Sequence, residues 1–229
     1  ITVENLLDAG EVSIQQSVVQ LQFTAISMHR SAIEALQNPG DSVRLDERDD
    51  GADRLFGMLT RHFNRSLTDF EETDALGVSR PALFTHCRVA REYERLADDS
   101  VTLAGVAESV ERPLPDGFGE SFEAVATDAR TLVEDATGLV LEEATVDEVT
   151  DLLGRSESVA AALETVETAL FETASGADPR LLRALDSVGR TAEGGRAVAR
   201  AALGTTTAGS RAASAGDVGV EVADGESTP

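Results

Sequence analysis

Two pairs of carboxylates are the side chains of this sequence best suited to bind a ligand. Asp49 and Asp53 form one pair and Glu94 and Asp98 the other, and the members of each pair are four residues apart. Residues at this spacing lie on one face of a helix. If the two helices pack antiparallel, four carboxylates can converge, and several oxygen ligands without sulfur or imidazole favour a hard or borderline divalent cation. We expect Mg²⁺, Mn²⁺, Fe²⁺ or Zn²⁺.

The chain is strongly acidic and contains no lysine. Its 229 residues include 19 arginines against 42 aspartates and glutamates, a formal net charge of -23. Such a surface is typical of a cytoplasm rich in salt, where screening reduces self-repulsion, so we expect a halophilic source. The charge argues against direct binding of nucleic acid or an anionic membrane. Acids four residues apart also arise by chance in this composition, as Asp46 and Asp50 do.

The remaining composition indicates a cytoplasmic protein. Cys87 is the single cysteine, so the chain can form no internal disulfide, and its neighbours predict a small core residue rather than a reactive thiol. No apolar run approaches the roughly 18 residues of a membrane span, and no signal peptide is visible. Because the sequence begins with Ile1 rather than methionine, we expect residues 1–12 to join a further N-terminal domain.

The periodicity of apolar residues predicts an all-α chain of six helices. Val18, Leu21 and Ile26 illustrate the helical spacing in the first segment. Turn residues and capping residues such as Ser79 and Asp178 separate the segments. The predicted helices span about residues 13–36, 42–67, 79–110, 119–143, 145–173 and 178–203, with a polar loop between the second and third.

The order of these segments indicates a duplicated three-helix unit. Pro113 and Pro115 separate a first repeat, residues 13–112, from a second, residues 117–203. In a low-identity alignment the segment 94–98 corresponds to 189–193, and 49–63 to 157–171. From residue 204 the composition turns to glycine, alanine, serine, threonine and acids, which predicts a disordered acidic tail over 204–229.

Two motifs resemble signatures of the PhoU family. The segment Arg91-Glu92-Tyr93-Glu94-Arg95-Leu96-Ala97-Asp98-Asp99 resembles its glutamate-arginine-hydrophobic-small-aspartate motif, and Asp49-Asp50-Gly51-Ala52-Asp53-Arg54-Leu55 resembles the partner motif. The resemblance covers about residues 13–203. It implies two tandem three-helix bundles, a metal cluster on Asp49, Asp53, Glu94 and Asp98, and a role in regulating phosphate uptake. The first residues of the chain also resemble the junction of archaeal members in which an AbrB-type DNA-binding domain precedes the PhoU part.

The second repeat departs from the family pattern. Gly189 and Ala161 stand where two of the acids are expected, while Glu193 and Glu157 keep the other two. With half of the ligands missing, we expect one metal cluster, in the first bundle. The second bundle would then be structural or face a partner, and exposed apolar surface on it would suit a homodimer.

The residues favour a regulator over an enzyme. A carboxylate-bridged di-iron bundle needs Glu-x-x-His pairs, but the positions three residues before His29, His62 and His86 are apolar. No nucleophile elbow or phosphate-binding glycine loop is present. The resemblance implies that partners are a phosphate transporter, a kinase or the transcription machinery. A ligand-free all-α interaction domain remains the alternative.

Overall fold

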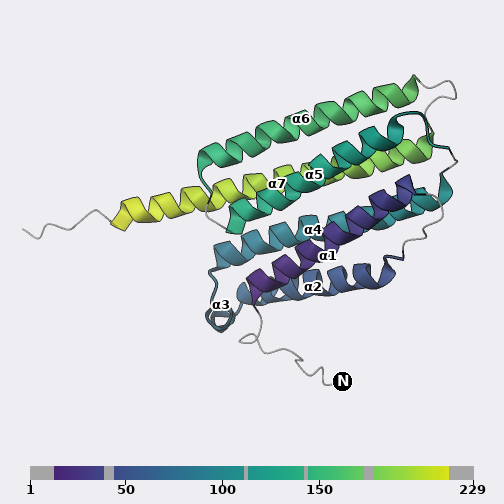
Figure 1. Cartoon of the computed structure of the whole chain (residues 1–229). Helices are drawn as coiled ribbons and strands as arrows, with labels where there is room; N and C mark the ends of the chain where they lie inside the picture. Colours follow the sequence, from purple (N-terminus) through teal and green to yellow (C-terminus); the bar gives the residue numbers. More distant parts are fainter. Residues whose placement is uncertain (1–12, 39–43, 111–112, 142–143, 173–177, 217–229) are drawn as a thin grey trace, which may run out of the picture.

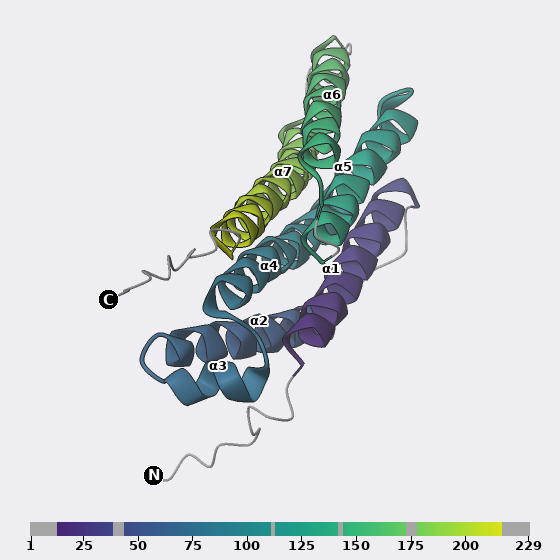
Figure 2. The same cartoon turned by 90° about the vertical axis from the view of Figure 1, so that its left-hand side faces the viewer.

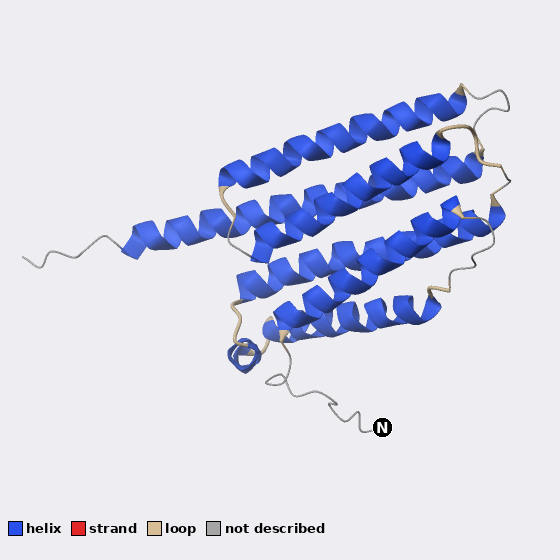
Figure 3. Ribbon diagram, in the orientation of Figure 1, coloured by secondary structure: helices blue, strands red, loops and turns tan. Residues whose placement is uncertain are grey.

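A computed structural model describes residues 13–38, 44–110, 113–141, 144–172 and 178–216, and in these residues it contains helices and no strand (Figure 3). The all-α prediction is therefore confirmed. The helices are α1 (Ile14–Gln37), α2 (Asp46–Ser66), α3 (Phe70–Leu76), α4 (Arg80–Ser109), α5 (Phe118–Leu141), α6 (Val146–Phe171) and α7 (Pro179–Gly216). None of the described helices is long and apolar enough to cross a membrane.

The long helices form two groups of three. Helices α1, α2 and α4 pack together, as do α5, α6 and α7, and the two groups meet mainly where α4 packs against α7 (Figures 1 and 2). The segment containing Pro113 and Pro115 connects α4 of the first group to α5 of the second. The acid pairs of the sequence therefore lie in the first group, on α2 and α4.

Local capping explains where most of these helices begin. The side chains of Ser13, Ser79 and Thr145 each accept a hydrogen bond from the backbone of the following turn. Thr145 and Glu148 form the capping box that the sequence predicts. Each cap satisfies an N–H group that has no partner inside the helix.

Two helix boundaries differ from the prediction. The segment expected to be a polar loop contains the short helix α3, which Asp69 caps and which ends at Gly77 with φ 63°. Aspartate before and glycine after a short segment is a signature of helix ends, which the high polarity of the segment concealed. The last helix continues to Gly216, beyond the boundary expected near Leu203. Residues 1–12 and 217–229, to which the junction and part of the tail were assigned, lie outside the described residues.

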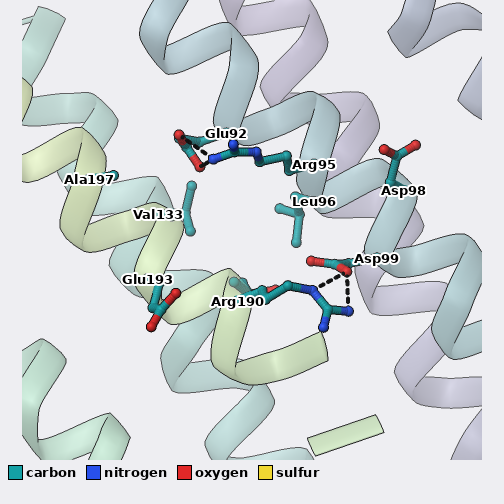
Figure 4. A pocket seen from close by; sticks show the side chains of 11 residues that line it. Glu92, Arg95, Leu96, Asp98, Asp99, Val133, Arg190, Glu193 and Ala197 are labelled. Carbon is teal, nitrogen blue, oxygen red and sulfur yellow. Dashed lines mark hydrogen bonds and ion pairs between the residues drawn. The ribbon is translucent and has the colours of Figure 1, made fainter. Parts of the chain in front are cut away.

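Partly buried polar contacts join the two groups of helices. Arg190 on α7 donates from Nε and Nη2 to Oδ1 of Asp99 on α4, at 2.9 and 2.6 Å. Ser187 on α7 donates to the Asp99 backbone oxygen at 3.2 Å. Figure 4 shows the Asp99–Arg190 pair between the two helices. Charge-assisted hydrogen bonds of this kind fix orientation as well as adding energy, so they define the register of α4 on α7.

The close approach of α7 to α5 at Gly195 predicts that alanine has opposite effects there and at Gly154, which faces open space. A Cβ at Gly195 of α7 would lie 3.0 Å from backbone atoms of α5 at Leu132 and Val133, whereas a Cβ at Gly154 of α6 would meet no atom within 4 Å. We expect Gly195→Ala to destabilise the fold by about 1–2 kcal/mol, because overpacking outweighs the gain in helix propensity. Gly154→Ala should stabilise it by up to about 1 kcal/mol. Urea unfolding of both variants measures the difference, and equal stabilisation by the two would contradict the tight packing.

Candidate metal centre

Two observations fix the alignment of α2 on α4. The rings of Phe63 and Phe84 lie 5.6 Å apart at one end of the helix pair. In the middle, the Cys87 thiol lies 3.4 Å from the Leu59 backbone oxygen. The two helices therefore run antiparallel, and each residue toward the start of α2 meets one toward the end of α4. This is the arrangement that the carboxylate spacing requires.

The two acid pairs lie within electrostatic reach of one another. Burial, together with the carboxylates of Asp53 and Asp98, raises the pKa of Asp49. Burial, followed by the charge of Asp98, raises the pKa of Glu94. The pKa of Asp98 is also raised, by burial and then by Asp53. Burial is the largest cause of these three pKa shifts, and repulsion between neighbouring carboxylates adds to it.

One oxygen of this cluster is buried without a partner. Asp49 is half-buried, and its Oδ1 has no solvent exposure and accepts no hydrogen bond in the structure. A buried acceptor left unsatisfied carries a desolvation cost of roughly 1–3 kcal/mol. Such an oxygen fits a cation ligand, because a bound cation would supply the missing interaction.

The four acids are not assembled as ligands in this arrangement. Within the described residues, no three histidine, cysteine, aspartate or glutamate side chains are placed so that they could hold a metal ion. Asp53 and Asp98 are exposed, whereas Asp49 and Glu94 are half-buried. The backbone thus brings the four carboxylates to one place, and shared coordination would require the two exposed side chains to turn inward.

Arginines border the cluster on one side. Arg91 lowers the pKa of Glu94 and Asp98, against the larger effects that raise it. Arg95 lies 3.1 Å from Glu92 and forms an ion pair with it, as Figure 4 shows. The charge of the acid cluster is therefore only partly balanced.

The histidines take no part in the cluster. The Nδ1 atom of His62 lies 2.5 Å from Oε1 of Glu72 on α3, and Arg65 binds the other oxygen of the same carboxylate at 3.1 Å. Nδ1 of His86 donates to the Ala82 backbone oxygen one turn earlier. His29 is fully buried. All three pack inside or between helices, and none supplies the Glu-x-x-His arrangement of a di-iron enzyme.

The cysteine is inert by environment. Cys87 is half-buried and packs against the hydrophobic core. Burial raises the pKa of its thiol to about 11. Because the thiolate is the nucleophilic form, this position offers no nucleophile at neutral pH.

The second group of helices presents a different surface at the corresponding place. A groove of about 440 Å³ between α6 and α7 is lined by Gly189 and Glu193, with Glu164, Glu167 and Asp186 nearby and Arg190 and Arg196 among them. Glu157 is exposed and does not line this groove. Its four acids face two arginines, one of which already binds Asp99, so this groove also remains net acidic.

A second groove lies between the two groups. It has a volume of about 540 Å³ and runs between α4 and α7, with Arg95 and Arg190 among its lining residues. In Figure 4 the Asp99 carboxylate points toward Arg190 and the Asp98 carboxylate away from that pair. Because both arginines are already bound to carboxylates, the groove offers no free cation for an anionic ligand.

Comparisons with protein-family models, curated proteins and solved structures find no match to this chain. The likeness to the PhoU family consequently depends on the two acid motifs and on their place on consecutive long helices.

Proposed function

We propose that this protein is a metal-binding, non-enzymatic regulator of phosphate uptake of the PhoU type. The convergence of Asp49, Asp53, Glu94 and Asp98 on α2 and α4 is the observation that supports the proposal most strongly. The two sequence motifs supply the link to phosphate. The acidic, lysine-free composition and the single cysteine support a cytoplasmic protein of a halophilic archaeon.

The cation would relieve a repulsion that the fold itself creates. Burial, followed by the charges of neighbouring carboxylates, raises the pKa of Asp49, Glu94 and Asp98 and makes it costly to ionise them together. A divalent cation shared by the two acid pairs would neutralise this charge and satisfy Asp49 Oδ1. Since the pairs belong to different helices, binding would hold α2 against α4, and the cation would be linked to the stability of the first bundle.

Regulation would then operate through protein partners. The protein would signal phosphate availability by binding a transporter, a kinase or the transcription machinery through surfaces of its helices. The protein would turn over no substrate, since neither Cys87 nor the histidines provide a nucleophile with a base. An N-terminal DNA-binding domain would add direct control of transcription.

The first test is stabilisation of the folded protein by Mn²⁺ or Mg²⁺. We expect either ion at 100 times its dissociation constant to add about 2.7 kcal/mol to the free energy of unfolding. The double variant Glu94→Gln, Asp98→Asn should be more stable than the wild type without metal, because the repulsion is removed, and should gain little from the ion. Thermal unfolding with and without metal measures both effects.

A matched control is available on α2. Asp46 and Asp50 have the same spacing and are exposed, and they affect the pKa of Asp49 less than Asp53 and Asp98 do. The variant Asp46→Asn, Asp50→Asn should retain the full metal response. Equal responses in the two double variants would reject the site and favour a ligand-free interaction domain.

The regulatory part requires a measurement in cells. Deletion of the gene should change phosphate uptake and phosphate-dependent transcription. Expression of the Glu94→Gln, Asp98→Asn variant in the deletion strain would show whether regulation needs the metal site or only the folded helical protein. Unchanged phosphate uptake and transcription in the deletion strain, together with a hydrolase or oxidase activity of the purified protein, would contradict the regulatory role and favour an enzyme.

A further inference from the structure

The exposed side of α4 carries arginines along a groove that it forms with α2. This groove has a volume of about 350 Å³, and three phenylalanines and three arginines line it, namely Phe56, Phe63, Phe84, Arg88, Arg91 and Arg95. Among the described residues that line the groove, Glu92 is the one acid, and it is paired with Arg95. Because the chain as a whole has a net charge of -23, the groove is a local reversal of the overall charge.

Two of these arginines are available for a partner. Arg88 lies over the ring of Phe84 at 5.9 Å and Arg91 over that of Phe56 at 5.4 Å. Both arginines are exposed, and neither forms an ion pair with another described residue. Arg91 acts on the neighbouring acid cluster through its charge alone. Stacking on the rings orients the guanidinium groups and leaves their edges free to bind carboxylates.

One end of the groove offers an apolar contact beside these charges. The rings of Phe63 and Phe84 lie 5.6 Å apart, and the Phe84 side chain remains 49% exposed. Aromatic rings supply much of the buried apolar area in protein interfaces. An occupant that combines negative charge with an apolar side chain would therefore satisfy both parts of the groove.

The length of the groove suits an elongated occupant. From Phe84 to Arg95 it follows about 17 Å of α4, and Arg88, Arg91 and Arg95 recur at intervals of three and four residues, which places them on one face. Glu92 and Arg95 also line the groove between α4 and α7, so the two grooves adjoin. Figure 2 shows α4 lying between α2 and α7. A single small anion would contact only one part of such a surface.

We propose that this groove is the docking surface for an acidic, amphipathic segment of a protein partner. Carboxylates of the segment bind Arg88 and Arg91 through charge-assisted hydrogen bonds, and its apolar side chains pack on Phe63 and Phe84. In a helical segment, acids three or four positions apart match the spacing of the arginines. The inference builds on the proposed function, since it gives the partner of the regulator a binding surface and a chemistry.

A nucleic acid fits this surface less well than an acidic peptide. Arginines and aromatic rings also bind phosphates and bases. The acid cluster, however, lies beside the groove, and the chain is strongly acidic. A polymer with a negative charge at every nucleotide would be repelled along most of its length, whereas a peptide can place its carboxylates opposite the arginines and apolar side chains elsewhere.

Selection from a random library of displayed peptides tests the chemistry of the partner. Peptides retained by the wild type at moderate salt should be enriched in acids and in apolar residues, and Arg88→Glu combined with Arg91→Glu should not retain them. The result is diagnostic because a chain with a net charge of -23 attracts basic peptides over most of its surface. Retained peptides without an excess of acids, or equal retention of acidic peptides by both proteins, would overturn the inference.

Fluorescence locates and measures the binding of a selected acidic peptide that lacks tryptophan. Because the chain contains no tryptophan, Phe84→Trp places a single reporter at the aromatic end of the groove. Its emission should shift to shorter wavelength when the peptide covers it. In this background, Arg88→Glu with Arg91→Glu should weaken binding by about 100-fold, and Arg88→Gln with Arg91→Gln by about tenfold. The control, Arg54→Glu with Arg61→Glu, changes exposed positions of α2 that do not line the groove and should bind as its parent does.

Two further results would contradict the docking surface. One is a loss of binding in the control as large as in the arginine variants. The other is arginine-dependent binding of a single-stranded RNA that is tighter than binding of the acidic peptide. Circular dichroism establishes that each variant is folded before affinities are compared. Peptide binding is measured without added metal, whereas the metal centre is tested by thermal unfolding, so failure of the one and failure of the other are distinguishable.

Discussion

Replacement of His29 by leucine should remove a large part of the acid sensitivity of this protein. His29 lies fully buried on α1, and neither ring nitrogen has a hydrogen-bond partner. Burial, with a smaller contribution from the charge of Arg130, lowers the pKa of His29 to about 3. The imidazole therefore stays neutral in the folded protein at pH values where it takes up a proton in the unfolded chain.

The direction of the effect follows from proton linkage. Because the pKa of His29 in the folded state, about 3, lies below that of the unfolded chain, the contribution of this residue to stability is intact above about pH 6.5 and is lost as the pH falls. At pH 5 the loss is about 2 kcal/mol relative to pH 8. The raised pKa values of Asp49, Glu94 and Asp98 act in the opposite direction, since protonation of these groups favours the folded state.

Urea unfolding at pH 8 and pH 5 measures the contribution of His29. His29→Leu should lose about 2 kcal/mol less than the wild type between the two pH values. It should also be the more stable protein at pH 8, because an apolar side chain replaces two unsatisfied nitrogens. His29→Gln separates the two effects, since it does not titrate but keeps polar atoms in the core. A wild type and a leucine variant with parallel pH dependence would contradict the buried neutral imidazole.

Local signals in the sequence account for much of the fold. Ser13, Ser79 and Thr145 identify helix starts because their caps depend on residues only three positions away. The acid pairs belong to the same class of signal. Their spacing places each pair on one helix face, and the short connection predicts neighbouring helices. That the two pairs approach each other depends in addition on the antiparallel packing of α2 and α4.

Contacts between residues distant in the sequence are the part that the sequence does not reveal. Arg190 and Asp99 are 91 positions apart, and the pair follows from the packing of α4 on α7. The neutral state of His29 depends in the same way on helices that cover it. The exposed position of Asp53 and Asp98 also depends on side-chain rotamers, so spacing predicts that the acids meet but not that they are assembled around an ion. The short helix α3 was missed for a local reason, since its polarity outweighed its two end signals.

Replacement of Tyr93 by alanine should have the largest effect on stability and should act on both groups of helices. Tyr93 on α4 is fully buried. Its hydroxyl lies 2.8 Å from Oγ1 of Thr137 and 3.3 Å from the Val133 backbone oxygen, both on α5. We expect Tyr93→Ala to cost about 3–5 kcal/mol, because it leaves a cavity at the junction of the two groups. Tyr93→Phe, which keeps the ring, should cost about 1 kcal/mol.

The composition makes the junction directly observable. Tyr93 is the single tyrosine of a chain without tryptophan, so tyrosine fluorescence reports the contact of α4 with α5, while far-ultraviolet circular dichroism reports all helices. If the two groups unfold together, the two signals change at the same urea concentration in the wild type. In Tyr93→Ala the entire dichroism transition then moves to lower urea as one step. A transition that divides into two, with one half at the wild-type midpoint, would show that the groups are independent and that the buried hydroxyl contributes to only one of them.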